Sequence, residues 1–257
     1  MKAFIRDFLR DRAPAWIFLA ALLAVWQLVV ASKWVPAYLL PSPSEIFEVT
    51  IKLWPDIQAA TLSTALAIVW GLGLSALVGI SLAISFFLVP FLRRAILPFC
   101  VFFQTVPIIS IAPLLVIWFG FGEPTVKASA FIVSLFPILA NTLTGLEETD
   151  PLLTELLRLY KPSPLAMIVK LQLPSALPYI LTGLRISAGL AVIGAIVGEF
   201  IAGGGLGSLI DSARTQQRVD LVFSGVLMSS ALALLLVFSI DIVTRLVLGG
   251  RPYLRKS

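Results

Sequence analysis

Long apolar runs alternate with short polar segments along most of this 257-residue chain. A helix needs about 20 apolar residues to cross the hydrocarbon core of a bilayer, where every backbone polar group must be bonded within the chain. The pattern therefore predicts an all-α membrane protein with about six transmembrane helices. The predicted spans are residues 15–31, 60–89, 98–120, 126–145, 176–200 and 221–248.

The composition agrees with this pattern. The chain is 59% hydrophobic and 13% charged, with a mean hydropathy of +1.00. Soluble domains carry about 25% charged residues, so a large soluble helical core is the weaker alternative. The first span follows a basic segment, as in a signal peptide, but it lacks a small-residue cleavage site, and we expect it to be retained. We expect a single domain over residues 1–257, with its core at about 60–248.

A helix start is visible after the first span. Ser42-Pro-Ser-Glu45 matches a capping box with proline at the first helical position. The residues that follow have one apolar side, and Pro55 interrupts them. We therefore predict a short helix at the membrane surface.

The polar segment 146–175 stands between two apolar spans. Asp150 is a suitable cap for a short helix over 152–160. A break at Lys161-Pro162 follows, because proline biases the preceding residue away from helix. A second short helix is predicted over Leu165–Leu171. Two short helices joined at a break suit docking to a soluble partner, and a solvated linker is the alternative.

Basic residues are distributed unequally between the two sides of the predicted membrane. Twelve Lys and Arg residues lie in the segments on the side of the N-terminus, against five on the other side. The positive-inside rule then places both termini and the 146–175 segment in the cytoplasm.

Small residues recur at four-residue spacing in two spans, and this spacing lets helices approach closely in lipid. The functional interpretation is a contact that slides or rocks during a transport cycle. Static helix packing is the alternative. The positions are Gly71, Ser75 and Gly79 in one span, and Gly183, Ser187, Ala191, Gly194, Ala195 and Gly198 in the other.

A few polar residues lie within or at the ends of apolar spans. Gln104, Asn141 and Glu199 are candidates for a substrate pathway or gate, because intramembrane polar groups usually face a bundle interior or a wet pathway. Interhelical hydrogen bonds are the alternative for the two amides. For Glu199, a cap or gate strut at the outer end of its span is the favoured interpretation. Asp241 and Arg245 have the spacing of an i,i+4 ion pair.

The residue inventory excludes several kinds of chemistry. The chain has no histidine and one cysteine, Cys100, so it can form neither a Ser-His-Asp triad, nor a His-ligated metal site, nor an internal disulfide. No phosphate-loop motif is present. We therefore expect no catalytic residue, metal or bound cofactor in this chain, and no nucleic acid partner.

The 146–175 segment also resembles a signature of the membrane subunits of ABC importers. That signature is glutamate and two alanines, three residues, glycine, nine residues, then I-x-L-P. The residues in register are Glu155, Leu171, Leu173 and Pro174. The two alanines and the glycine are replaced by Leu156, Leu157 and Lys161.

Other segments resemble the same family in order and spacing. Leu40–Ser44 is similar to the nitrate/sulfonate/taurine branch, and thiamine-precursor and riboflavin permeases look much alike. The further matching segments are 104–107, 112–115, 117–120, 136–142, 173–186 and 199–207.

The resemblance implies a type I ABC importer-like permease subunit in a bacterial inner membrane. Its expected partners are a dimer of ATPase subunits that bind ATP, an extracytoplasmic binding protein and a second copy of itself. Its substrate would be a small anion, a sulfonate or a vitamin-like heterocycle. The ATPase-coupling residues would be Glu155, Leu156, Leu157, Lys161, Pro162, Leu165, Leu173 and Pro174. The pathway or gate residues would be Gln104, Asn141, Gly194, Gly198 and Glu199.

Two other classes remain as alternatives. A secondary transporter would work without an ATPase, but would usually show inverted repeats and helices broken at mid-membrane. A membrane-bound enzyme would need clustered acids, histidines or a nucleophile with a base. The sequence shows none of these patterns.

Overall fold

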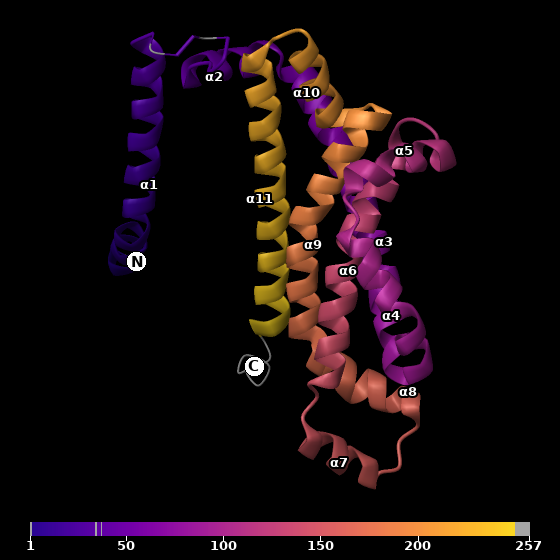
Figure 1. Ribbon diagram of the computed structural model, residues 1–257. Coiled ribbons are helices and arrows are strands. Elements are labelled where there is room, and N and C mark those ends of the chain that lie inside the picture. Colours follow the sequence, from indigo (N-terminus) through magenta and orange to yellow (C-terminus); the bar gives the residue numbers. More distant parts are fainter. Residues whose placement is uncertain (1, 34, 37, 250–257) are drawn as a thin grey trace. The chain divides into compact units, whose positions relative to one another are not determined.

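The computed structural model describes residues 2–33, 35–36 and 38–249, and every regular element within these ranges is a helix. The predicted all-α class is therefore confirmed. The elements are α1 (Lys2–Ala31), α2 (Pro43–Lys52), α3 (Trp54–Leu88), α4 (Pro90–Thr105), α5 (Ile108–Phe119), α6 (Glu123–Glu147), α7 (Pro151–Leu159), α8 (Pro164–Met167), the π-helical turn η1 (Ile168–Gln172), α9 (Leu173–Ala202), α10 (Gly205–Thr215) and α11 (Val219–Gly249) (Figure 1).

Four continuous helices of the described chain are long and apolar enough to cross a membrane: α3, α6, α8–α9 and α11. A fifth span is formed if α4 and α5 are counted together. The first predicted span corresponds to a shorter apolar helix, Trp16–Ala31, within α1. The chain is therefore a multi-pass membrane protein. The basic residues Arg251, Arg255 and Lys256, used for the orientation, lie outside the described residues.

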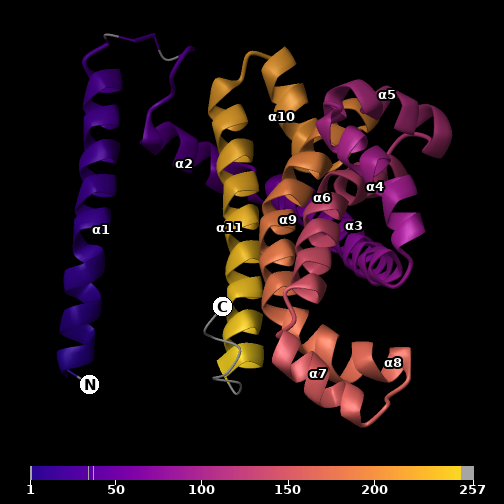
Figure 2. The ribbon, with the colours of Figure 1, turned by 60° about the horizontal axis from the view of Figure 1, so that its bottom comes forward.

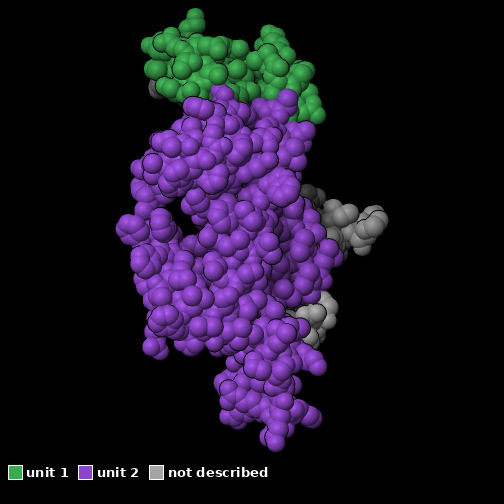
Figure 3. Space-filling view, turned by 90° about the vertical axis from the view of Figure 1, so that its right-hand side faces the viewer, with its two compact units in different colours: residues 1–58, 209–227 green, residues 59–208, 228–257 purple. Residues whose placement is uncertain are grey.

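The chain divides into two compact units, which Figure 3 shows in different colours. Unit 1 holds residues 1–58 and 209–227, and unit 2 holds residues 59–208 and 228–257. Helices α3, α10 and α11 each begin in one unit and continue into the other. The expectation of a single domain stays a prediction.

Unit 1 contains the predicted surface helix. The Ser42 hydroxyl accepts a hydrogen bond from the Glu45 amide at 3.2 Å, and the Ser42 amide donates to the Glu45 carboxylate at 2.7 Å. This is the complete capping box, and it begins α2 where the sequence predicted. Thr50 on α2 shares a 2.7 Å hydrogen bond with Ser224, which ties α2 to the first turns of α11.

The centre of unit 2 is the antiparallel pair of α6 and α9, which lie side by side in Figures 1 and 2. One buried cluster joins this pair to α3 through Ile68, Ala130 and Ala195. A second cluster, around Phe86 and Leu139, joins it to α3 and to partly buried side chains of α4. The sequence placed apolar residues in these helices, and packing decided which of their faces are buried.

The predicted span 98–120 is not one straight helix. It is split between α4 and α5, whose axes differ by 106°. Pro107 stands at the break as the first residue before α5, and it has no N–H with which to continue α4. The preceding residue, Val106, is extended with φ −74° and ψ 124°, as steric contact with a following proline favours. The predicted apolar segment is therefore present, but it is sharply bent at Pro107.

The boundary before the fifth span also differs from the prediction. The second short helix does not end at Leu171, because α8, η1 and α9 form one continuous apolar helix over Pro164–Ala202. Within it, the Leu173 amide bonds to the Ile168 carbonyl, five residues back. Pro174 has no N–H for the normal bond to Lys170, so the local widening to a π turn accommodates it.

Candidate functional site

The first candidate element is the exposed helix α7 with the turn that follows it, at the end of unit 2 remote from α5 (Figures 1 and 2). Asp150 caps α7 by accepting from the Leu152 amide at 2.8 Å, and Ser163 caps α8 by accepting from the Ala166 amide at 3.2 Å. The predicted helix-break-helix is thus confirmed up to residue 167.

The break lies where the sequence placed it and has an unusual conformation. Lys161 has φ +47°, in the left-handed region that glycine adopts easily. Its amide closes α7 by bonding to the Arg158 carbonyl at 2.9 Å. Lys161 occupies the position of the glycine in the ABC importer signature, so the turn geometry explains why glycine suits that position. Here a lysine adopts the same backbone at a cost of about 1–2 kcal/mol.

Helix α7 exposes leucines that a soluble surface would normally bury. Leu152, Leu156 and Leu159 lie on one stripe of the helix with exposed fractions of 74%, 56% and 77%. Tyr160, at 79%, and Leu165 on α8, at 69%, extend the apolar surface. Such a patch on a short polar loop is typical of a protein contact surface.

The remaining predicted coupling residues are divided between two environments. Glu155 and Lys161 are exposed, whereas Leu157 and Pro162 are half-buried. Leu173 and Pro174 belong to the first turn of α9, and Leu173 packs against the buried cluster around Phe86. Leu173 therefore helps to anchor α9 to the core, and both residues lie outside the exposed loop.

The second candidate element is the interface of α6 with α9. An added Cβ at Gly194 would lie 2.7 Å from the Ser129 carbonyl oxygen, and one at Gly198 would lie 3.0 Å from the Ser129 hydroxyl. The predicted small-residue face is therefore confirmed as a close helix contact. Whether it moves stays a prediction.

Hydroxyl groups extend this interface to α3. Ser187 on α9 donates to the Ser134 carbonyl at 2.6 Å, and Ser134 shares a 2.7 Å hydrogen bond with Ser75 on α3. The four-residue spacing of small residues includes Ser75 and Ser187 but does not point to Ser134. Its only signal was a small polar residue within an apolar span, eight residues after Val126 on the same helix.

Glu199 is 2% exposed and its carboxylate is surrounded by hydrogen-bond donors. Thr64 on α3 donates to it at 2.7 Å, and the Gly207 amide donates at 2.8 Å. The Thr64 oxygen accepts in turn from the Leu206 amide at 2.9 Å. Glu199 and Thr64 thereby each satisfy one free N–H group at the start of α10, where an acidic group is favourable.

The glycines after Glu199 make this arrangement possible. Gly205 has φ +59°, and a Cβ there would collide with the Glu199 carboxylate. A Cβ at Gly207 would lie 2.6 Å from the Ile196 carbonyl oxygen. The chain can therefore turn tightly around the carboxylate only without side chains at these positions. The sequence offered no signal for the partner Thr64.

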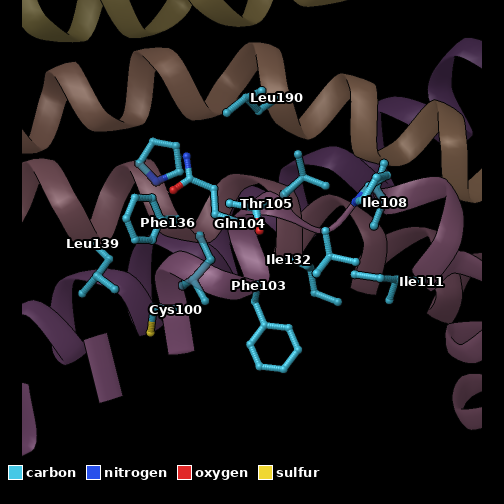
Figure 4. A pocket seen from close by; sticks show the side chains of 15 residues that line it. Cys100, Phe103, Gln104, Thr105, Ile108, Ile111, Ile132, Phe136, Leu139 and Leu190 are labelled. Carbon is cyan, nitrogen blue, oxygen red and sulfur yellow. The ribbon is translucent and has the colours of Figure 1, made fainter. Parts of the chain in front are cut away.

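The third candidate element is an open cavity of about 460 Å³ at the corner between α4 and α5, bordered by α6 and by Leu190 of α9 (Figure 4). Gln104 lines it and is exposed. Asn141 does not line it. The Asn141 amide donates to the Pro137 carbonyl on its own helix at 2.8 Å, and its Cβ packs against Gly183. The residues predicted for the pathway are therefore not gathered in one place.

One predicted ion pair is wrong. Asp241 pairs with Arg185 on α9, with Nε and Oδ1 3.0 Å apart, and not with Arg245 one turn away on α11. Residues four apart on a helix can meet, but α9 brings a second arginine to Asp241. The pair links α9 to the part of α11 that belongs to unit 2.

Comparison with known proteins agrees with this geometry. Residues 75–249 match the model of a family described as the binding-protein-dependent transport system inner membrane component. A probable ABC transporter permease protein of Haemophilus influenzae is 36% identical over 88% of this chain and 92% of its own length. The formylaminopyrimidine transport permease protein ThiX of Halalkalibacterium halodurans is 37% identical over 85% of this chain and 88% of its own.

A third relative is named for a different solute. The putative aliphatic sulfonates transport permease protein SsuC of Bacillus subtilis is 32% identical over 81% of this chain and 76% of its own length. These relatives are transport permeases and not enzymes. The matched family model covers more than half of the chain, including all the helices that build the three candidate elements except the first part of α3. This chain belongs to the binding-protein-dependent transport system inner membrane components, the permease family of ABC importers.

Proposed function

We propose that this chain is the membrane-spanning subunit of an ATP-driven importer, and that two copies of it form the translocation pathway. ATP is bound and hydrolysed by a dimer of separate ATPase subunits. An extracytoplasmic binding protein delivers the solute. The family membership and the absence of a phosphate-loop motif in the sequence support this division of labour.

The observation that carries the proposal is the exposed apolar stripe of α7, followed by the left-handed turn at Lys161. Burying three leucine side chains against a partner provides a favourable contact, since each contributes roughly 1.5–3 kcal/mol when fully buried. The charged residues Glu155 and Arg158 lie on the same short helix and supply polar specificity at its rim. Helix α7 is thus the segment that docks on the ATPase.

The same proposal includes an orientation of the chain in the membrane. The excess of basic residues on the side of the N-terminus supports a cytoplasmic location for both termini and for α7. Movement of the ATPases then reaches the spans through α8 and η1, because these continue directly into α9. The pathway alternates between facing the binding protein and facing the cytoplasm, in a bacterial inner membrane.

The proposal leaves three classes of solute: a small anion, a sulfonate or a vitamin-related heterocycle. Relatives are named for formylaminopyrimidine, aliphatic sulfonates and riboflavin. Because the binding protein selects the ligand in such systems, a ligand-binding screen on the cognate binding protein identifies the solute.

The test of docking is a charge reversal on α7. Glu155→Lys places a third cation beside Arg158 and Lys161, and we expect at least about a tenfold loss of co-purified ATPase or of ATP-dependent uptake. Membrane insertion should remain normal because Glu155 is exposed. Glu48→Lys on α2 is the control, since that glutamate is also exposed, forms only an exposed ion pair with Lys52, and lies outside the proposed docking surface.

Wild-type uptake and normal recovery of the complex in the Glu155→Lys variant would contradict docking through α7. Uptake that persists without any ATPase subunit would favour the secondary transporter instead.

A further inference from the structure

The cavity at the α4–α5 corner has a chemical character that bears on the solute. Fifteen residues line it, from Cys100 on α4 to Leu190 on α9, and within the described chain none of these lining residues is charged. Most are aliphatic, and two are aromatic, Phe103 and Phe136. Its volume of about 460 Å³ lies in the range typical of small-molecule sites.

One uncommitted polar side chain reaches this cavity. Gln104 makes no side-chain hydrogen bond within the described part of the chain, and its amide lies among the lining groups in Figure 4. The amide offers two donors and one acceptor oxygen. The hydroxyl of Thr105, which also lines the cavity, already donates to the Phe102 carbonyl at 2.8 Å. Gln104 is therefore the group that can recognise the polar edge of a ligand.

The backbone at the corner does not favour one sign of charge. The carboxyl end of α4 and the amino end of α5 meet there, and their partial charges are opposite. An anion entering the cavity would lose its water without gaining a cationic partner, which is costly in an apolar environment. An uncharged ring meets no such penalty, and the Phe136 ring provides a surface for stacking.

We infer that this cavity binds an uncharged, flat heteroaromatic solute, held by the Gln104 amide at its polar edge and by Phe136 at its face. The inference rests on the proposed function, since it assigns the cavity to the pathway of that importer. Of the three classes of solute that the proposed function leaves open, the inference selects the heterocycles over the sulfonates and the small anions.

The native Cys100 provides the assay, because it is the only cysteine of the chain and it lines the cavity. The complete complex with ATPase and binding protein is placed in lipid nanodiscs and trapped with nucleotide. Alkylation of Cys100 by N-ethylmaleimide is then followed by mass spectrometry, with an aminopyrimidine, riboflavin, taurine or bicarbonate as the added probe. We expect at least one of the two heterocycles to slow alkylation, and taurine and bicarbonate to leave its rate unchanged.

Two variants make the assignment specific. Gln104→Leu keeps the size of the side chain but removes the amide, and should raise the half-protecting concentration of the heterocycle about fivefold. Phe99→Leu is the matched control on the same helix, because Phe99 is 64% exposed and does not line the cavity. It should retain wild-type protection.

Three results would overturn the inference: protection by taurine or bicarbonate, protection by none of the probes, or no alkylation because lipid or a second copy of the chain fills the cavity. Uptake is measured with the same purified complex reconstituted in proteoliposomes, and ATPase recovery is measured in parallel. If both are normal while protection fails, only the cavity assignment is refuted. If both are absent, the proposed function itself fails.

Discussion

The close contact between α6 and α9 gives a prediction whose size follows from the distances. At Gly194 an added Cβ would lie 2.7 Å from the Ser129 carbonyl oxygen and 3.1 Å from the Ala130 Cα, whereas ordinary contact begins at 3.4 Å. The obstacle is backbone, so Gly194→Ala requires the two helices to separate by about 0.7 Å. Overpacking of this kind costs about 1–3 kcal/mol, which at least cancels the helix propensity of about 1 kcal/mol that alanine gains over glycine.

Two further glycines of α9 calibrate the effect. At Gly198 the nearest atom is the movable Ser129 hydroxyl at 3.0 Å, so Gly198→Ala should cost less than Gly194→Ala. At Gly189 nothing lies within 4 Å of an added Cβ, so Gly189→Ala should be neutral or stabilising. Gly189→Ala should therefore be the most stable of the three variants, Gly198→Ala intermediate and Gly194→Ala the least stable.

In the assay, the detergent-solubilised complex is heated, and the fraction that remains intact is measured by size-exclusion chromatography. Uptake is measured in parallel. Gly194→Ala should lower the apparent Tm by about 2–6 °C relative to Gly189→Ala, by the usual scaling of Tm with free energy of unfolding for a chain of this size. If the Gly194→Ala complex is as stable as the Gly189→Ala complex, the described contact is refuted. Loss of uptake in a fully assembled variant identifies a moving contact, and equal loss of assembly and uptake identifies static packing.

Three other predictions concern the turn at residue 161, the orientation of the chain and the Glu199 cap. Lys161→Gly should raise the free energy of unfolding by roughly 0.5 kcal/mol and so raise the apparent Tm slightly, because relief of the left-handed backbone outweighs the added chain entropy; a clear loss of stability would contradict this. In a Cys100→Ala background, Arg214→Cys should react with an impermeant maleimide in intact cells, whereas Lys161→Cys should react only after permeabilisation, and the reverse pattern would overturn the orientation. Gly205→Ala should abolish recovery of folded protein, since its Cβ would displace the Glu199 carboxylate, and normal recovery by fluorescence-detected chromatography would refute the cap.

Much of the local structure could be predicted from the sequence because its causes are local. The capping box at Ser42 needs only residues within three positions of it, and Asp150 and Ser163 cap helices by the same short-range geometry. The break at Lys161-Pro162 follows from proline sterics. Lengths of apolar sequence likewise identify spans, since lipid imposes the same requirement on every backbone group.

The tertiary structure was needed wherever partners come from distant segments. Spacing on one helix suggested Arg245 for Asp241, but packing of α9 beside α11 supplies Arg185 instead. Likewise, Glu199 looked like a residue of uncertain role until Thr64, 135 positions away, and the Gly207 amide were placed around its carboxylate.

The segment 98–120 shows the same difference between what is local and what depends on distant residues. The apolar run 98–120 and its prolines fixed the presence of a membrane segment, but the 106° angle between α4 and α5, and the cavity at their corner, depend on what α6 and α9 leave open. The sequence by itself determined an all-α membrane protein with an exposed polar loop, because hydropathy and capping act over a few residues. Only the tertiary structure decided which small residues touch, which charges pair and where a solute could bind, because those contacts join residues that the chain keeps far apart.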